Sequence, residues 1–100
     1  MEKIRLSISS KELAKLCERY HIRKLAFFGS VLRDDFNANS DVDVLVEFEE
    51  GYIPGLDFID IQDDLSKILG GHEVDLVTPK FLNDRIRDRV LKEARVAYAA

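Results

Sequence analysis

The sequence of 100 residues has a formal net charge of −4 at pH 7, with 46% hydrophobic and 34% charged residues. This size fits one domain spanning residues 1–100, with a real core and a well-solvated surface. The acidic balance permits nucleotides but argues against a nucleic-acid partner or an anionic membrane surface, which require a basic footprint. A single cysteine, no long apolar run and no signal-peptide pattern favour a cytoplasmic protein without a membrane segment.

The N-terminal part of the sequence predicts a helix followed by a short strand. Ser9 and Glu12 have the spacing of a capping box, and apolar residues continue at helical spacing to about His21. The apolar run 24–28 ends at a glycine, which is typical of a buried strand.

The middle of the sequence predicts a second strand between two irregular segments. Residues 30–35 suit a short helical turn, and residues 36–40 contain Asn and Ser, which favour turns. Residues 41–48 alternate and are rich in valine, as expected for a strand. Residues 49–55 hold two glycines and a proline, so we expect an exposed loop there.

The C-terminal half predicts a helix, a strand and a final helix. Residues 56–69 carry an amphipathic stripe that ends at two glycines, which suit a left-handed C-cap. Residues 73–77 form the third expected strand. Thr78 is a suitable N-cap followed by proline, so the last helix is expected to run from there to about Val96.

This order of elements predicts an α/β domain in which helices pack on a small sheet of about three or more strands. The first two strands are separated by only about twelve residues, which is short for a crossover between parallel strands. We therefore expect a mixed sheet.

A glycine-serine turn after the first strand is a candidate phosphate-binding site. Gly29 allows a ligand to approach the backbone closely, and the N–H groups that follow, with the Ser30 hydroxyl, favour phosphate. Arg33 lies on the same side of the turn, where it could bind a triphosphate or hold an aspartate. The alternatives are a tight turn without a ligand and a surface arginine.

Two aspartates at the start of the second strand are candidate metal ligands. Asp41 and Asp43 project to the same face because alternate residues of a strand do so. Adjacent carboxylates repel each other unless a cation lies between them, and Mg²⁺ prefers oxygen ligands. Asp41 could instead be a polar entry to the strand, and Arg33 could be the partner of Asp43.

Asp75 is the third candidate, since it is an acid inside the apolar third strand. If that strand lies beside the second, the three carboxylates could hold two metal ions roughly 3.5–4 Å apart. Asp75 would then suit a general base that takes the proton of an attacking hydroxyl. Glu73 has the same strand parity and competes for this role, but burial is expected to favour Asp75.

Together these motifs resemble the DNA polymerase β-type nucleotidyltransferase superfamily, and more narrowly the minimal nucleotidyltransferases, the MntA-like antitoxins encoded beside HEPN-domain toxins. The resemblance extends from about Leu13 to Val96. The motifs that carry it are Phe28-Gly29-Ser30, Arg33, Ser40-Asp41-Val42-Asp43 and Val74-Asp75-Leu76-Val77.

The resemblance implies a site and a reaction. Two Mg²⁺ ions would be held by Asp41, Asp43 and Asp75, and Gly29 and Ser30 would bind the nucleotide phosphates. Arg33 and Ser40 are the further nucleotide-binding candidates. Such antitoxins transfer AMP from ATP to a tyrosine hydroxyl of a HEPN-type RNase toxin, and pyrophosphate leaves.

Three other functions stay open on the sequence. A non-catalytic antitoxin would neutralise its partner by binding, although the three intact aspartates argue against it. A nucleotidyltransferase for a small-molecule hydroxyl would be expected to carry a second domain that builds the acceptor pocket. An RNA-binding module would need more positive charge than this sequence has.

Overall fold

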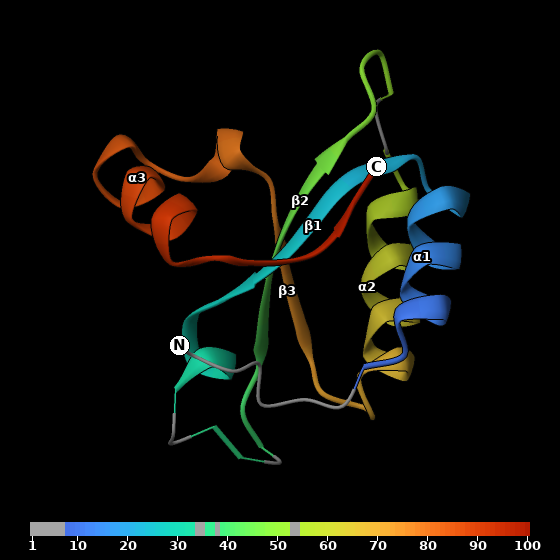
Figure 1. Ribbon diagram of the computed structural model, residues 1–100, viewed down its shortest axis with the longest axis horizontal. Coiled ribbons are helices and arrows are strands. Elements are labelled where there is room, and N and C mark those ends of the chain that lie inside the picture. The colour runs from blue at the N-terminus through green and yellow to red at the C-terminus, as the bar shows by residue number, and fades with distance from the viewer. Residues whose placement is uncertain (1–7, 34–35, 38, 53–54) are drawn as a thin grey trace.

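A mixed four-stranded sheet organises the chain in the computed structural model, which describes residues 8–33, 36–37, 39–52 and 55–100 (Figure 1). The strand order is β3-β2-β1-β4. Strand β1 is antiparallel to both β2 and β4, whereas β2 and β3 are parallel. The predicted mixed α/β architecture is confirmed. The strands are β1 (Ile22–Phe28), β2 (Val42–Phe48), β3 (Val74–Val77) and β4 (Arg95–Ala99).

Helices cover both faces of this sheet. Helices α1 (Ser10–Arg19) and α2 (Asp57–Ile68) lie side by side on one face, and α3 (Asp84–Glu93) lies on the other (Figure 1). The described part of the chain contains no helix of the length and apolar character that a membrane crossing requires.

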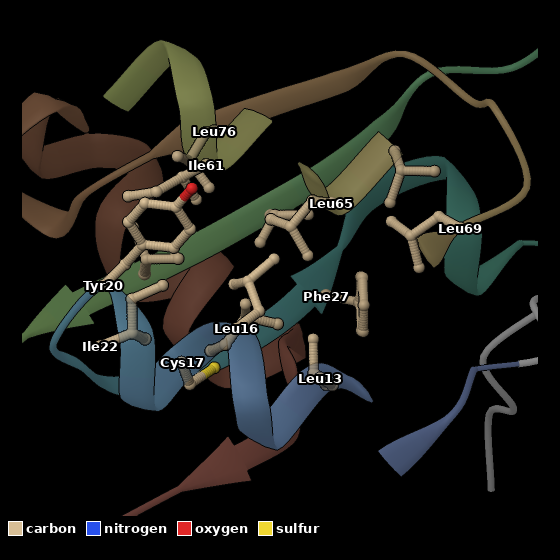
Figure 2. Close-up of a cluster of buried hydrophobic side chains, with 14 of the residues drawn as sticks. Leu13, Leu16, Cys17, Tyr20, Ile22, Phe27, Ile61, Leu65, Leu69 and Leu76 are labelled. Carbon is tan, nitrogen blue, oxygen red and sulfur yellow. The ribbon is translucent and has the colours of Figure 1, made fainter. Parts of the chain in front are cut away.

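The main core lies between the sheet and the pair α1 and α2. Leu13, Leu16 and Leu65 from the helices meet Phe27 of β1 there (Figure 2). Phe27 is fully buried, and burying a side chain of this size stabilises the fold by about 1.5–3 kcal/mol. Alternate residues of β2 enter the same cluster, so the opposite side of this strand is left for other side chains.

A smaller apolar cluster lies on the second face of the sheet. Ala26 of β1 and Leu45 of β2 are buried there under Leu82, with Val90 and Ala94 from the region of α3 packed against them. Helix α3 itself has no fully buried residue. This face is therefore thinly covered, and part of it stays accessible beside α3.

The predicted ends of the first two helices are confirmed. The Ser9 hydroxyl accepts a hydrogen bond from the Glu12 N–H at 3.3 Å, and α1 ends at Arg19, two residues before the predicted position. At the end of α2, Gly71 N–H donates to Ser66 C=O at 2.7 Å and Gly70 N–H donates to Lys67 C=O at 3.4 Å. These two bonds form a Schellman motif.

The single long helix predicted after Thr78 is wrong. A 3₁₀ turn (Pro79–Phe81) comes first, and Asn83 then caps α3 by accepting hydrogen bonds from two backbone N–H groups at 3.0 and 3.1 Å. Arg95 and Val96, which are expected at the end of the helix, instead begin β4. The open edge of β1 offers unpaired backbone groups, and pairing with β4 satisfies them. Tertiary hydrogen bonding thus outweighs the local helical pattern.

The irregular segments lie where the sequence predicts them. The expected turn after β1 is a 3₁₀ helix (Gly29–Leu32), and Arg33 follows it in extended backbone. Residues 34, 35 and 38 of the predicted turn and loop, and residues 53 and 54 of the second loop, lie outside the described residues.

Tyr20 connects the two helices that cover the core, and this contact predicts a pH dependence. Its hydroxyl donates to the Asp64 carboxylate at 2.5 Å, and this bond, with burial, raises the pKa of Tyr20 to about 12. The folded protein therefore holds the phenol proton more tightly than the unfolded chain, in which the pKa is about 10. The resulting stability is complete below pH 10 and is lost as the pH rises through about 12.

We expect Tyr20→Phe to lower the free energy of unfolding by about 1–2 kcal/mol at pH 7, because the ring stays and the hydrogen bond to a charged group is lost. The difference from wild type should shrink between pH 10 and 12. Urea denaturation across this range measures it. If the free energies of unfolding of the two proteins differed by the same amount at every pH, the hydrogen bond to Asp64 would not be the cause of the raised pKa of Tyr20.

Candidate active site

The sheet register brings the predicted acids together. Asp43 of β2 is the direct neighbour of Asp75 in the parallel pair β2–β3, and it lies opposite Phe28 of β1. Asp41 immediately precedes β2 with the same parity as Asp43. Because Val42 and Val44 between and beside them are fully buried toward α1 and α2, the acids lie on the other face of the sheet.

The burial argument that favoured Asp75 over Glu73 is wrong, because both side chains are exposed. β3 is an edge strand, so its outer face has fewer neighbours than the sequence pattern suggests. Register distinguishes the two acids instead. Asp75 is paired with Asp43, whereas Glu73 lies one step before the strand and accepts the Val42 N–H through its carbonyl at 2.8 Å.

The glycine-serine turn contacts both Asp43 of β2 and Asp41, the residue before this strand. Ser30 donates its backbone N–H to the Asp43 carboxylate and its hydroxyl to the Asp41 carbonyl at 3.0 Å. Gly29 has φ +75°, and a Cβ at this position would overlap the Asp43 carboxylate, with the carboxyl carbon at 3.2 Å. The turn therefore requires glycine for two reasons, its backbone conformation and its contact with Asp43.

Electrostatic strain concentrates on Asp43. Partial burial, followed by the charges of Asp75 and Asp41, raises the pKa of Asp43. The Ser30 N–H and the charge of Arg33 act in the opposite direction and favour the ionised carboxylate. Arg33 is exposed, so it reaches the site from the solvent side. A cation among the three carboxylates would relieve their repulsion.

The donor set suits a hard divalent cation. Carboxylate oxygens are the protein ligands that Mg²⁺ prefers, and the lack of a side chain at Gly29 leaves room for the Asp43 carboxylate beside the turn. Among the residues that the structure describes, no three acidic, histidine or cysteine side chains are grouped closely enough to hold an ion. The backbone register thus places the acids side by side, and binding an ion requires the carboxylates to turn toward one another.

Ser40 has a place in the loop before Asp41. Its N–H donates to Asn37 C=O at 3.0 Å, and its hydroxyl accepts the Asn37 N–H at 3.1 Å. These two bonds close the loop, so the Ser40 hydroxyl already has a backbone partner. Its role toward a nucleotide remains a prediction.

His72 is a residue of this region that sequence reasoning missed. Its Nδ1 lies 2.9 Å from the Ser40 carbonyl oxygen, and its ring packs on Phe36 with 5.0 Å between ring centroids. The contact joins residues that are 32 positions apart in the sequence, so no local motif predicts it. The sequence offers only a hydrogen-bond donor directly after the glycine pair that ends α2.

A small α/β sheet that presents a glycine-serine turn beside paired acids on two parallel strands is the arrangement of a nucleotidyl-transfer site. The nucleotidyltransferase domain family matches residues 10–97 of the chain. The chain therefore belongs to this family and is a nucleotidyltransferase.

Individual relatives agree with this membership. The protein adenylyltransferase MntA of Thermococcus cleftensis is 41% identical over 88 residues, which cover 87% of this chain and 86% of the relative. A solved structure assigned to the minimal nucleotidyltransferases has a TM-score of 0.71 and 37% identity over 86% of both chains.

A more distant solved structure, a toxin–antitoxin complex with AMP-PNP, has a TM-score of 0.70 and 18% identity. The aligned region covers 93% of this chain and 75% of the matched chain in that structure. At this identity the likeness extends to the fold alone.

The raised pKa of Asp43 predicts that this side chain opposes folding when it is ionised. At pH 7 without divalent cations, Asp43→Asn should increase the free energy of unfolding by about 1 kcal/mol or less, because a partly buried charge that also repels Asp75 and Asp41 is removed. The pKa is higher in the folded protein than in the unfolded chain. The gain is therefore largest at neutral pH and disappears as the pH falls below about 4.

Thermal unfolding from pH 7 to pH 3 measures this effect, and Asp63→Asn on the exposed side of α2 serves as the control for removal of one negative charge. A rise of a few degrees is expected for Asp43→Asn alone at pH 7. An equal rise in melting temperature for both variants would mean that the effect comes from the net charge of the protein and not from the surroundings of Asp43.

The contact between Gly29 and Asp43 predicts a cost beyond backbone strain. Gly51 has a similar φ of +83° with nothing within 4 Å of the position of a Cβ, so Gly51→Ala is a matched control. Both alanine variants should lose about 1–2 kcal/mol through the left-handed backbone. Gly29→Ala should lose more, because the methyl group overlaps the Asp43 carboxylate.

Urea denaturation of the two variants, with and without Asp43→Ala, separates these contributions. Removal of the Asp43 carboxylate should bring the cost of Gly29→Ala close to that of Gly51→Ala. An equal cost in the wild-type background would exclude a close contact at Gly29.

Proposed function

We propose that this protein is a Mg²⁺-dependent protein adenylyltransferase that acts as an antitoxin and transfers AMP from ATP to a tyrosine hydroxyl of a HEPN-type RNase toxin. The observation that carries the proposal is the register of Asp43 beside Asp75, with the turn of Gly29 and Ser30 in contact with Asp43 and with Asp41 just before β2. Membership of the family and 41% identity to a protein adenylyltransferase support this reaction.

Asp41, Asp43 and Asp75 would hold two Mg²⁺ ions. Bound divalent ions neutralise the triphosphate, lower the pKa of the attacking hydroxyl and stabilise the leaving pyrophosphate. Asp43 must be ionised to serve as a ligand. Its raised pKa therefore makes ion binding weaker at acid pH, since protons compete for the same oxygens.

The glycine-serine turn and its surroundings would bind the nucleotide. Gly29 lets phosphate approach the backbone, and the backbone N–H groups of the 3₁₀ turn that it begins would favour an anion. Arg33 is exposed beside the acids, where its guanidinium can pair with phosphate oxygens. Ser40 lies at the entrance to β2 and completes the set of expected nucleotide-binding residues.

Asp75 would act as the general base. Its carboxylate is exposed on an edge strand, so an acceptor side chain can approach it from outside. The acceptor hydroxyl gives its proton to Asp75 while its oxygen attacks the α-phosphorus of ATP. The bond from this phosphorus to the bridging oxygen of the β-phosphate breaks, and pyrophosphate leaves.

Solved toxin–antitoxin structures support the choice of partner. One contains an AMPylated HEPN toxin of Shewanella oneidensis together with an MNT antitoxin, and it has a TM-score of 0.62 to this chain. Another was solved with AMP-PNP, an analogue of ATP. Both resemble this chain in fold, and on this basis we extend the kind of partner and nucleotide to it.

The test combines the purified protein with ATP, Mg²⁺ and the product of the neighbouring gene, which we expect to be the HEPN-type partner. Intact-mass spectrometry of the partner should show an AMP-sized increase with the wild type and with Asp63→Asn. The increase should be absent, or at least about 100-fold slower, with Asp41→Asn or Asp43→Asn, because these variants lose metal ligands. No mass change, with tight binding by all variants, would identify an antitoxin that acts by binding alone.

A further inference from the structure

We infer that His72 is a positioning residue for the nucleotidyl-transfer site and holds the peptide between Ser40 and Asp41 at the place from which the Asp41 carboxylate can turn toward the other acids. The inference rests on the proposed function of Asp41 as a metal ligand. It assigns a role to a side chain that belongs to none of the motifs of the site.

The hydrogen bond between His72 and Ser40 has only one chemical assignment. A carbonyl oxygen can only accept, so Nδ1 must carry the hydrogen across the 2.9 Å contact. Both the neutral ring with its proton on Nδ1 and the doubly protonated ring meet this requirement.

His72 is itself held in place by one contact of its ring and one of its backbone. Its ring packs on Phe36 at 5.0 Å between centroids, with an angle of 31° between the planes. The carbonyl of His72 accepts the Ser66 hydroxyl at 2.7 Å, and Ser66 belongs to the last turn of α2. His72 thus connects a helix of the main core to the loop that carries Asp41.

Asp41 needs this support because it lies just outside the sheet. β2 begins at Val42, whose N–H forms the first bond to the β3 side by donating to the Glu73 carbonyl at 2.8 Å. The Asp41 carbonyl accepts from Ser30, while the carbonyl before Asp41 accepts from His72. Asp43, by contrast, lies inside the sheet and is fixed by both neighbouring strands.

Loss of the His72 donor should therefore loosen one acid and leave the others in place. Two successive carbonyls, those of Ser40 and Asp41, orient the peptide that carries this side chain. Without the first anchor, the peptide gains conformational freedom that binding an ion must remove again. Ordering one residue costs about 1–2 kcal/mol, and the lower end of this range corresponds to roughly a fivefold to tenfold loss of affinity.

The experiment measures binding of Mn²⁺ alone by the electron paramagnetic resonance of the free ion. His72→Phe keeps a ring that can pack on Phe36 but removes the donor, and it should weaken Mn²⁺ binding fivefold to tenfold. His72→Asn places an amide N–H where Nδ1 was and should stay within about twofold of wild type. His21→Phe is the matched control, since His21 also packs on an aromatic ring, that of Tyr52, and should leave binding unchanged.

A second readout separates positioning from general stability. In the transfer reaction, His72→Phe should raise the Mg²⁺ concentration needed for half-maximal rate by the same factor, with kcat at saturating Mg²⁺ within about twofold of wild type. Its melting temperature should fall by no more than about 4–8 °C. A larger fall would assign His72 a structural role and overturn the inference.

The outcomes also distinguish this inference from the proposed function. In one outcome, the wild type binds Mn²⁺ with an affinity that His72→Phe leaves unchanged and that Asp43→Asn abolishes. This result would overturn only the role of His72. If His72→Asn bound Mn²⁺ as weakly as His72→Phe, the role of His72 would also be overturned, because restoring the hydrogen-bond donor would not restore binding. Absence of Mn²⁺ binding by the wild type would overturn the metal site and the inference together.

Discussion

The parallel pairing of β2 with β3 is the constraint on which the site depends, because it places Asp43 directly beside Asp75. The buried residues Val42 and Val44 fix which face of β2 points to the core. A slip of one residue would exchange the two faces, burying Asp43 and exposing valine. The hydrophobic core therefore specifies the register, and the register specifies the acid cluster.

The two faces of the sheet carry different features of the protein. The face toward α1 and α2 carries the main core, and its close packing supplies the stability that the repelling acids reduce. The other face holds the acids at one end and a small apolar cluster under Leu82 and α3 farther along the strands. This separation lets an electrostatically strained site exist on a small sheet without disturbing the packing beneath it.

The loop before β2 is fixed mainly by hydrogen bonds. Ser40 is held against Asn37 by two hydrogen bonds, one from its N–H and one to its hydroxyl, and its carbonyl oxygen contacts His72. The turn of Gly29 and Ser30 approaches the same segment from β1 and holds the Asp41 carbonyl. Directional bonds of this kind can place a short segment where few apolar side chains are available to pack.

The sequence by itself determined the α/β class, the capped ends of α1 and α2, and the candidate residues Gly29, Asp41 and Asp43, because local spacing and turn chemistry carry these features. Only the tertiary structure decided that residues 95 and 96 leave the predicted helix and form β4 together with residues 97–99, since the free edge of β1 is a distant partner. It also decided the exposure of Asp75 and the contact of His72. Strand order and contacts between remote residues arise when the whole chain packs, and no local pattern encodes them.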